Sequence, residues 1–190
     1  MIRIGILGDI GSGKSYVAKN FGYPVFNADL EVSKLYKKDK KIFYKFRKIL
    51  PKYFYSFPVN KNQIIKAILD DKKNLNLIIK IVHFEIKKKM KIFLKNKKNK
   101  KIIILDIPLL MENNINKKND ILVFVHSKKV DILKRLKKRK NINLKLIKKF
   151  RNIQLPLAYK KKKSQFIIRN DFTKKTVKKK INDILENILT

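Results

Sequence analysis

The chain has 190 residues, the length of one domain, and 44% of them are hydrophobic, which is enough for a buried core. It contains no cysteine, which excludes disulfide bonds and thiolate metal sites, and its apolar runs are too short to span a bilayer. The formal net charge is +36, from 50 basic and 14 acidic residues.

Such a charge is typical of proteins that bind nucleic acids or membrane surfaces. Here, however, the lysines are distributed along the whole chain, and they accompany abundant Ile and Asn, while Arg, Ala, Gly and Pro are scarce. Because AT-rich codons encode Lys, Ile and Asn, we interpret the charge as a compositional bias of the genome. We therefore expect a soluble cytoplasmic protein with no specific nucleic-acid partner and no membrane partner, although its surface will attract polyanions.

Five short apolar segments are predicted to form strands, and they lie at residues 2–7, 23–27, 101–107, 120–125 and 165–168. Segment 101–107 (KIIILDI) is apolar nearly throughout and is followed by Pro108, which is typical of a buried parallel strand. Segment 15–21 is predicted to be a helix, and lysine-rich helical segments separate the later strands. This alternation predicts an α/β domain around a five-stranded parallel sheet.

Two helical segments are longer than a simple crossover between strands needs. Residues 30–98 contain a cluster of aromatic side chains, which favours core filling over a platform for stacking bases. Residues 128–163 are very basic and contain Arg135, Arg139 and Arg151. This second segment is either a solvated helical surface or a lid that closes over phosphates. We expect both segments to be parts of one domain that spans residues 1–190.

The segment Gly8–Ser15, GDIGSGKS, fits the pattern G-x-x-x-x-G-K-[ST], with a predicted strand before it and a predicted helix after it. Glycines let the backbone N–H groups of such a loop approach a phosphate closely. In this pattern Lys14 reaches the β- and γ-phosphates of a nucleotide and the Ser15 hydroxyl binds Mg²⁺. The segment therefore predicts a nucleotide-phosphate site, and we expect Asp9 to point away from it.

The other motifs of the chain and its length exclude several classes of nucleotide-binding protein. A GTPase needs N-K-x-D to read its base, and residues 116–119 read NKKN, without the acid. Transporter ATPases and helicases need longer chains. A small metabolite or nucleotide kinase remains, in which a lid supplies cations and an acid orients the acceptor hydroxyl.

The chain resembles the dephospho-CoA kinase family in five motifs that occur in the same order. Residues 5–15 (GILGDIGSGKS) resemble G-L-T-G-G-I-G-S-G-K-S, residues 25–29 (VFNAD) resemble V-I-D-A-D, and residues 108–112 (PLLME) resemble P-L-L-F-E. The lid pattern R-L-x-x-R, followed by R-x-x-x-Q-x-P-x-x-x-K, and the closing V-I-x-N resemble the chain at these residues: Arg135, Leu136, Arg139, Arg151, Gln154, Pro156, Lys160, Ile167, Ile168 and Asn170. Arg151 lies one position nearer to Gln154 than the pattern has it.

The resemblance implies a P-loop kinase fold with three layers, an acceptor-binding helical insertion at about residues 30–98 and a basic helical lid at about 128–163. It implies transfer of the γ-phosphate of ATP, with Mg²⁺, to the ribose 3′-hydroxyl of dephospho-CoA. The catalytic residues that it implies are Asp29, Lys14 and Arg139. Asp29 would orient the acceptor hydroxyl or accept its proton; alternatively, it would simply be the N-cap of a helix.

The remaining implied site residues fall into three groups. Those expected to bind ATP are Gly8, Gly11, Ser12, Gly13, Lys14, Ser15, Tyr16, Arg135, Arg139 and Asn170, with Asn170 reading the adenine edge. Those expected to bind the acceptor are Asp29, His83, Arg151, Gln154 and Lys160. Asp106 is expected either to hold Mg²⁺ through water, beside Ser15, or to start the turn at Pro108. His83 could equally be a packed helical histidine.

The chain also departs from the family pattern. Asn27 stands in place of the first acid of D-A-D, Ser33 in place of a basic residue, and Phe84 in place of the proline after His83. Asp171 and Phe172 follow Asn170 without the usual glycine. The competing functions are another small P-loop kinase with a nucleotide-like acceptor and an ATP-dependent nucleic-acid-binding protein.

Overall fold

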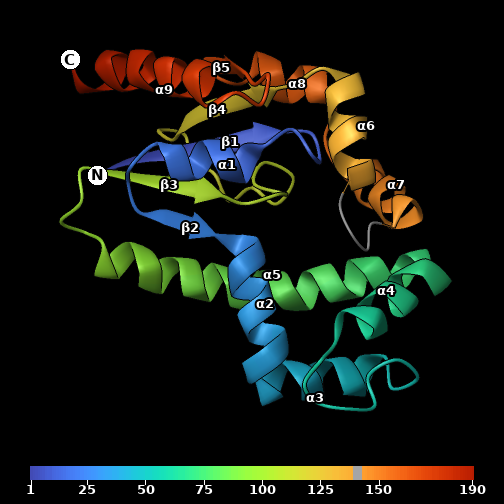
Figure 1. Ribbon diagram of the computed structural model, residues 1–190. Helices are drawn as coiled ribbons and strands as arrows, with labels where there is room; N and C mark the ends of the chain where they lie inside the picture. Colours follow the sequence, from blue (N-terminus) through green and yellow to red (C-terminus); the bar gives the residue numbers. More distant parts are fainter. Residues whose placement is uncertain (139–142) are drawn as a thin grey trace. The chain divides into compact units, whose positions relative to one another are not determined.

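The computed structural model describes residues 1–138 and 143–190 (Figure 1). Five parallel strands form one sheet in the order β2-β3-β1-β4-β5. Their bounds are β1 Ile2–Gly8, β2 Val25–Asn27, β3 Ile102–Asp106, β4 Ile121–His126 and β5 Phe166–Arg169. Each lies on a predicted strand segment, so the predicted α/β fold with a five-stranded parallel sheet is confirmed. β2 is shorter than predicted because it begins after Pro24, which has no N–H for the sheet.

The described chain divides into two compact units. The first contains the sheet and comprises residues 1–27, the described part of 97–142, and 153–190. The second comprises residues 28–96 and 143–152 and is helical. The basic segment 128–163 is thus shared between the units, since residues 143–152 group with the second one.

In the first unit, the core lies between the sheet and two helices, α1 (Lys14–Asn20) and α9 (Lys174–Leu189). The alternate side chains of β1, β3 and β4 and one side chain of β5 pack against them. This core cluster comprises Ile4, Ile6, Ile102, Ile104, Val123, Val125, Ile168, Val17, Ala18, Phe21, Val177, Ile181 and Ile184. The turns after β3 and helix α8 (Leu157–Lys162) pack on β1, where a Cβ on Gly5 would lie 2.5 Å from the Leu110 side chain. Both faces of the central strands are buried, which explains their continuous apolar sequence.

The second unit contains helices α2 (Ala28–Lys38), α3 (Lys40–Ile49), α4 (Lys61–Asp70), α5 (Lys72–Asn96) and α7 (Leu144–Asn152). Its aromatic side chains pack on one another; the Phe46 and Phe54 rings stack with centroids 4.6 Å apart, and both are fully buried. The predicted core-filling role of these aromatics therefore holds for that pair, while Tyr44 and Tyr55 are exposed.

Helix α7 is fixed to α4 within the second unit. The Lys149 ammonium donates to the carbonyl oxygens of Ile68 at 2.6 Å and Leu69 at 3.1 Å. These carbonyls lie in the last turn of α4, where a cation interacts favourably with the helix dipole. Across residues 1–138 and 143–190, none of the helices combines the length and the apolarity that crossing a bilayer requires.

Candidate active site

The loop between β1 and α1 depends on glycine at three positions. Gly8, Gly11 and Gly13 have φ of 143°, 89° and 93°, which L side chains rarely adopt. A Cβ on Gly8 would lie 2.5 Å from the Val125 carbonyl oxygen, and one on Gly13 would lie 2.3 Å from the Asn170 amide nitrogen. No larger residue fits these positions without moving the backbone or its neighbours. The loop therefore has the compact, glycine-dependent form that its sequence pattern predicts.

The polar side chains of the loop bond along its backbone. The Lys14 ammonium donates to the carbonyl oxygens of Gly8 at 3.1 Å and Asp9 at 2.8 Å, so it reaches back across the loop. The Asp9 carboxylate accepts from the Ile10 N–H at 2.6 Å. Ser15 and Tyr16, which follow on α1, are exposed. A flexible ammonium held by carbonyl oxygens can exchange these partners for phosphate oxygens, because both are hydrogen-bond acceptors.

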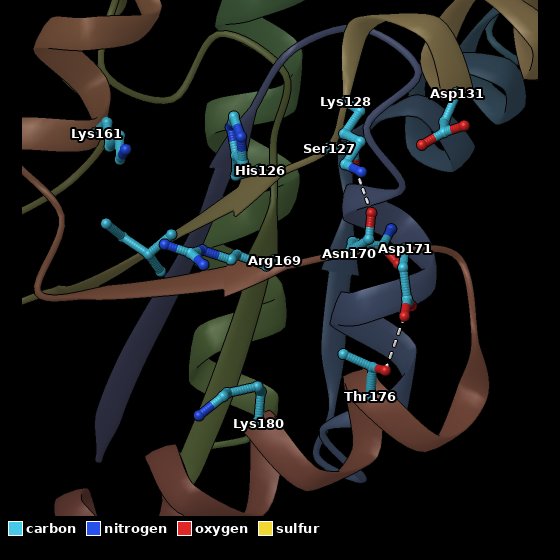
Figure 2. A pocket seen from close by; sticks show the side chains of 11 residues that line it. His126, Ser127, Lys128, Asp131, Lys161, Arg169, Asn170, Asp171, Thr176 and Lys180 are labelled. Atoms are coloured by element: carbon cyan, nitrogen blue, oxygen red, sulfur yellow. Dashed lines mark hydrogen bonds between the residues drawn. The ribbon is translucent and has the colours of Figure 1, made fainter.

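Ser127, which follows β4, and Asn170, which follows β5, support the centre of the loop. The Ser12 carbonyl oxygen accepts from the Ser127 hydroxyl at 3.0 Å and from the Asn170 amide at 2.8 Å. The Ser127 hydroxyl also donates to the Asn170 carbonyl oxygen at 2.9 Å. Figure 2 marks this hydrogen bond with a dashed line. All three residues are buried. Ser127 was not predicted as a site residue from the sequence. The available signal was its position directly after β4, the strand beside β1, from which the glycine loop starts.

Asn170 has a different environment from the one expected of an adenine-reading residue. Its amide oxygen accepts from the Phe172 N–H at 2.9 Å, and its amide nitrogen donates to Ser12. The side chain is 3% exposed. Through these contacts Asn170 supports the phosphate loop in this chain.

At the end of β3, Asp106 pairs with Asn27 at the end of β2. The two residues are in register, and the Asn27 amide donates to the Asp106 carboxylate at 2.5 Å. Asp106 is 4% exposed, and its strand is the neighbour of β1, from which the glycine loop starts. With an acid at position 27, two carboxylates would adjoin and repel each other. Asn27 removes that repulsion, so Asp106 is the one carboxylate of this pair.

Helix α6 (Lys129–Lys138) approaches the loop at Gly11. A Cβ on Gly11 would lie 3.0 Å from Ile132 and 3.2 Å from Leu136, both on α6. Arg135, which lies on the same helix, places its guanidinium carbon 4.3 Å from the centroid of the Phe172 ring. The structure thus brings the expected ATP-binding Arg135 to the unit that holds the glycine loop. Arg139 lies outside the described residues.

Lys160 is not available as the acceptor-binding cation that the family pattern implies. Its side chain is 1% exposed, and its ammonium lies 2.5 Å from the Glu112 carboxylate, which is 8% exposed. The same carboxylate oxygen accepts from the Leu155 N–H at 3.0 Å. A buried pair of this kind cannot release its lysine without leaving a charge unpaired. The direct acceptor contact expected of Lys160 is therefore corrected to a structural contact that ties α8 to the turns after β3.

The other expected acceptor residues are distributed over both units. Gln154 is half-buried in the first unit, just before α8, whereas Arg151 is exposed at the end of α7 in the second unit. Asp29 and His83 also belong to the second unit. Asp29 is exposed in the first turn of α2, which begins at Ala28. Because Asp29 lies inside the helix, it is not the N-cap, and this alternative for Asp29 is wrong.

Two titratable side chains of the second unit have shifted pKa values. Burial raises the pKa of Tyr36, and the negative charge of Asp29 raises it further. Burial lowers the pKa of His83, as does the charge of Lys87. The His83 Nε2 is buried and has no hydrogen-bond partner among the described residues. His83 therefore combines a favoured neutral form with an unused polar atom, which suits either a packed histidine or a ligand contact.

The sheet order, the glycine loop after its central strand, and the lysine and serine that start the next helix together define a P-loop kinase. The solved structure of the dephospho-CoA kinase from Campylobacter jejuni has the same fold, with a TM-score of 0.62 over 98% of this chain and 96% of that one, at 19% identity. A model of the dephospho-CoA kinase family matches residues 2–176.

Relatives with this description are similar in sequence as well. The dephospho-CoA kinase of Bartonella quintana (strain Toulouse) is 30% identical over 191 residues, which cover 98% of this chain and 97% of the relative. That of Wolbachia sp. subsp. Brugia malayi (strain TRS) is 34% identical over 129 residues, 65% of this chain and 66% of the relative, just under two thirds of its length. The chain belongs to the dephospho-CoA kinase family, which confirms the resemblance in its motifs.

Proposed function

We propose that the protein transfers the γ-phosphate of ATP to the ribose 3′-hydroxyl of dephospho-CoA. The observation that carries this proposal is the glycine loop Gly8–Ser15, with three positive φ angles and a lysine that already rests on carbonyl acceptors. Membership of the dephospho-CoA kinase family supports the identity of the acceptor. In phosphoryl transfer the protein mainly positions the reactants and neutralises charge, and a cradle of this kind does both.

For the donor, we assign Lys14 to the β- and γ-phosphates and the backbone of Gly8, Gly11, Ser12 and Gly13 to the phosphate oxygens. Tyr16 and Arg135 complete the described part of the ATP site, and Arg139 is proposed from the family pattern alone. An arginine is suited to the charge of the transferring phosphoryl group because its planar fork forms two parallel hydrogen bonds. In a chain so rich in lysine, an arginine marks a position where that fork is needed.

For the acceptor, we assign Asp29 to the hydroxyl that attacks. Its exposure in the first turn of α2 leaves the carboxylate accessible to a ligand. Burial raises the pKa of Tyr36, further along the same helix, and the negative charge of Asp29 adds to this. His83, Arg151 and Gln154 are proposed as further acceptor contacts. Lys160 supports this site only indirectly, through its buried pair with Glu112.

The residues present also fit a magnesium ion. Ser15 supplies an exposed hydroxyl at the start of α1, and Asp106 supplies a buried carboxylate at the end of the strand beside β1. Mg²⁺ prefers oxygen ligands and keeps several of its waters, so one hydroxyl, a carboxylate behind water, and substrate phosphates suffice. When bound, the ion would neutralise phosphate charge. Asn27 holds the Asp106 carboxylate in place, and no group of three or more metal-ligating side chains occurs in the described residues.

The test is a coupled assay of ADP release with ATP, Mg²⁺ and a panel of acceptors: dephospho-CoA, AMP, shikimate and none. We expect turnover to require dephospho-CoA and to fall about 100-fold or more in Lys14→Ala, because the transferring phosphate loses its nearest charge. A higher kcat/KM with another acceptor would contradict the proposed substrate. ATP turnover that responds to RNA or DNA at moderate salt would favour the nucleic-acid-binding alternative.

A further inference from the structure

Phe172 occupies an unfavourable backbone conformation beside the phosphate loop. Its φ is 66°, in the left-handed region that a phenylalanine rarely adopts. Backbone strain of this kind persists only where the surroundings impose it, and it is found mainly at functional sites. The position therefore raises the question of what the phenylalanine ring contributes that glycine would not.

The loop that contains Phe172 is fixed at both of its ends. The Phe172 N–H donates to the Asn170 amide oxygen at 2.9 Å, and Asn170 in turn donates to Ser12 of the phosphate loop. On the other side, the Asp171 carboxylate accepts from the Thr173 N–H at 2.9 Å and from the Thr176 hydroxyl at 2.9 Å, the latter visible in Figure 2. The Phe172 backbone is thus held between the phosphate loop and the first turn of α9.

This placement puts the Phe172 ring between the phosphate loop and Arg135. One ring atom, Cε1, lies 3.3 Å from the point where a Cβ on Gly13 would stand, and the ring centroid lies 4.3 Å from the Arg135 guanidinium carbon. A cation over the face of an aromatic ring is attracted by the ring quadrupole. A glycine at position 172 would offer Arg135 no such surface.

We propose that Phe172 is a positioning residue that holds the Arg135 guanidinium against the phosphate loop for the donor nucleotide. The inference rests on the proposed function in so far as Arg135 is a donor contact. Arginine carries several rotatable bonds, and fixing it before ATP arrives removes part of the entropy cost of binding. The strained backbone of Phe172 thereby places its ring where it positions Arg135.

The test compares the affinity for ATP, measured by calorimetry, and the KM for ATP among variants of Phe172. In Phe172→Gly and Phe172→Leu we expect ATP binding to weaken about 3- to 10-fold, as for the loss of a partly buried cation–π contact. Phe172→Tyr, which keeps the π face, should bind ATP as the original chain does. The Tm of Phe172→Gly should stay the same or rise, because glycine accepts the positive φ without strain. Weaker binding without lower stability separates positioning from a merely structural role.

Two controls make the result decisive. Asn114 also has a positive φ, of 50°, so Asn114→Gly relieves a similar backbone conformation and should leave ATP affinity unchanged. In an Arg135→Gln background, Phe172→Gly should have no further effect on ATP affinity, because the two residues act as one unit. An undiminished effect in that background, or unchanged ATP affinity in Phe172→Gly and Phe172→Leu, would overturn the proposal. Because ATP binding needs no acceptor, these outcomes are independent of whether dephospho-CoA is the substrate.

Discussion

Replacing Lys160 with Met distinguishes the structural assignment of this lysine from the acceptor contact implied by the family pattern. The substitution keeps most of the length of the side chain and removes its charge. It leaves the Glu112 carboxylate, which is 8% exposed and 2.5 Å from the ammonium in the original chain, with the Leu155 N–H as its remaining partner. The second carboxylate oxygen of Glu112 is buried and has no partner in the described part of the chain. Lys160→Met therefore buries a poorly compensated charge.

The expected loss of stability follows from this burial. Breaking one side of a buried ion pair costs about 3–5 kcal/mol. At about 2 cal/mol/K per residue, a chain of 190 residues has an unfolding entropy of about 0.4 kcal/mol/K. Thermal unfolding followed by circular dichroism should therefore show a Tm lower by about 8 to 12 °C. Well below that Tm, the KM for the acceptor should be unchanged.

Two further variants serve as controls. Lys161→Met removes an exposed lysine from the same helix, and its Tm should shift by about 1 °C or less. The double variant Glu112→Gln/Lys160→Met removes both charges and keeps an acceptor for Leu155, so most of the lost stability should return. The reasoning is refuted if Lys160→Met keeps the original Tm while the KM for dephospho-CoA rises. That result would restore Lys160 as a direct acceptor contact.

The remaining predictions concern the second unit. Asp29→Asn should lower kcat about 10²- to 10⁴-fold, as expected for a general base, with ATP affinity and Tm little changed; an active variant in the ADP-release assay would remove Asp29 from the chemistry. The pKa of His83 is lowered by burial, so the unfolded chain binds its proton more tightly than the folded one. The free energy of unfolding should therefore be lower below pH 6.5, the ordinary pKa of histidine, than above it. His83→Gln should flatten this part of the Tm profile between about pH 5 and 8; an unaltered profile would show that His83 is not its source.

The sequence by itself determined the sheet and the phosphate loop. Short apolar segments bounded by turns, such as KIIILDI, are buried on both faces in a parallel sheet, and their length and β-branched content are visible in the local sequence. The spacing of Gly8, Gly13 and Lys14 also carries its own geometry, because glycine adopts the positive φ of the loop with the least strain. These features depend on neighbours in sequence, so they could be predicted.

The tertiary structure alone decided which polar side chains are committed to internal contacts. Lys160 and Glu112 are 48 positions apart in the sequence, and nothing in one lysine among many indicates burial. Asn170 is held by Ser12, 158 positions away, and Ser127 completes that contact from a third strand end. Parallel strands bring their carboxyl ends together at one edge of the sheet, so residues distant in sequence meet there and compete for the same partners. Such pairing depends on register and burial, which the order of residues does not express locally.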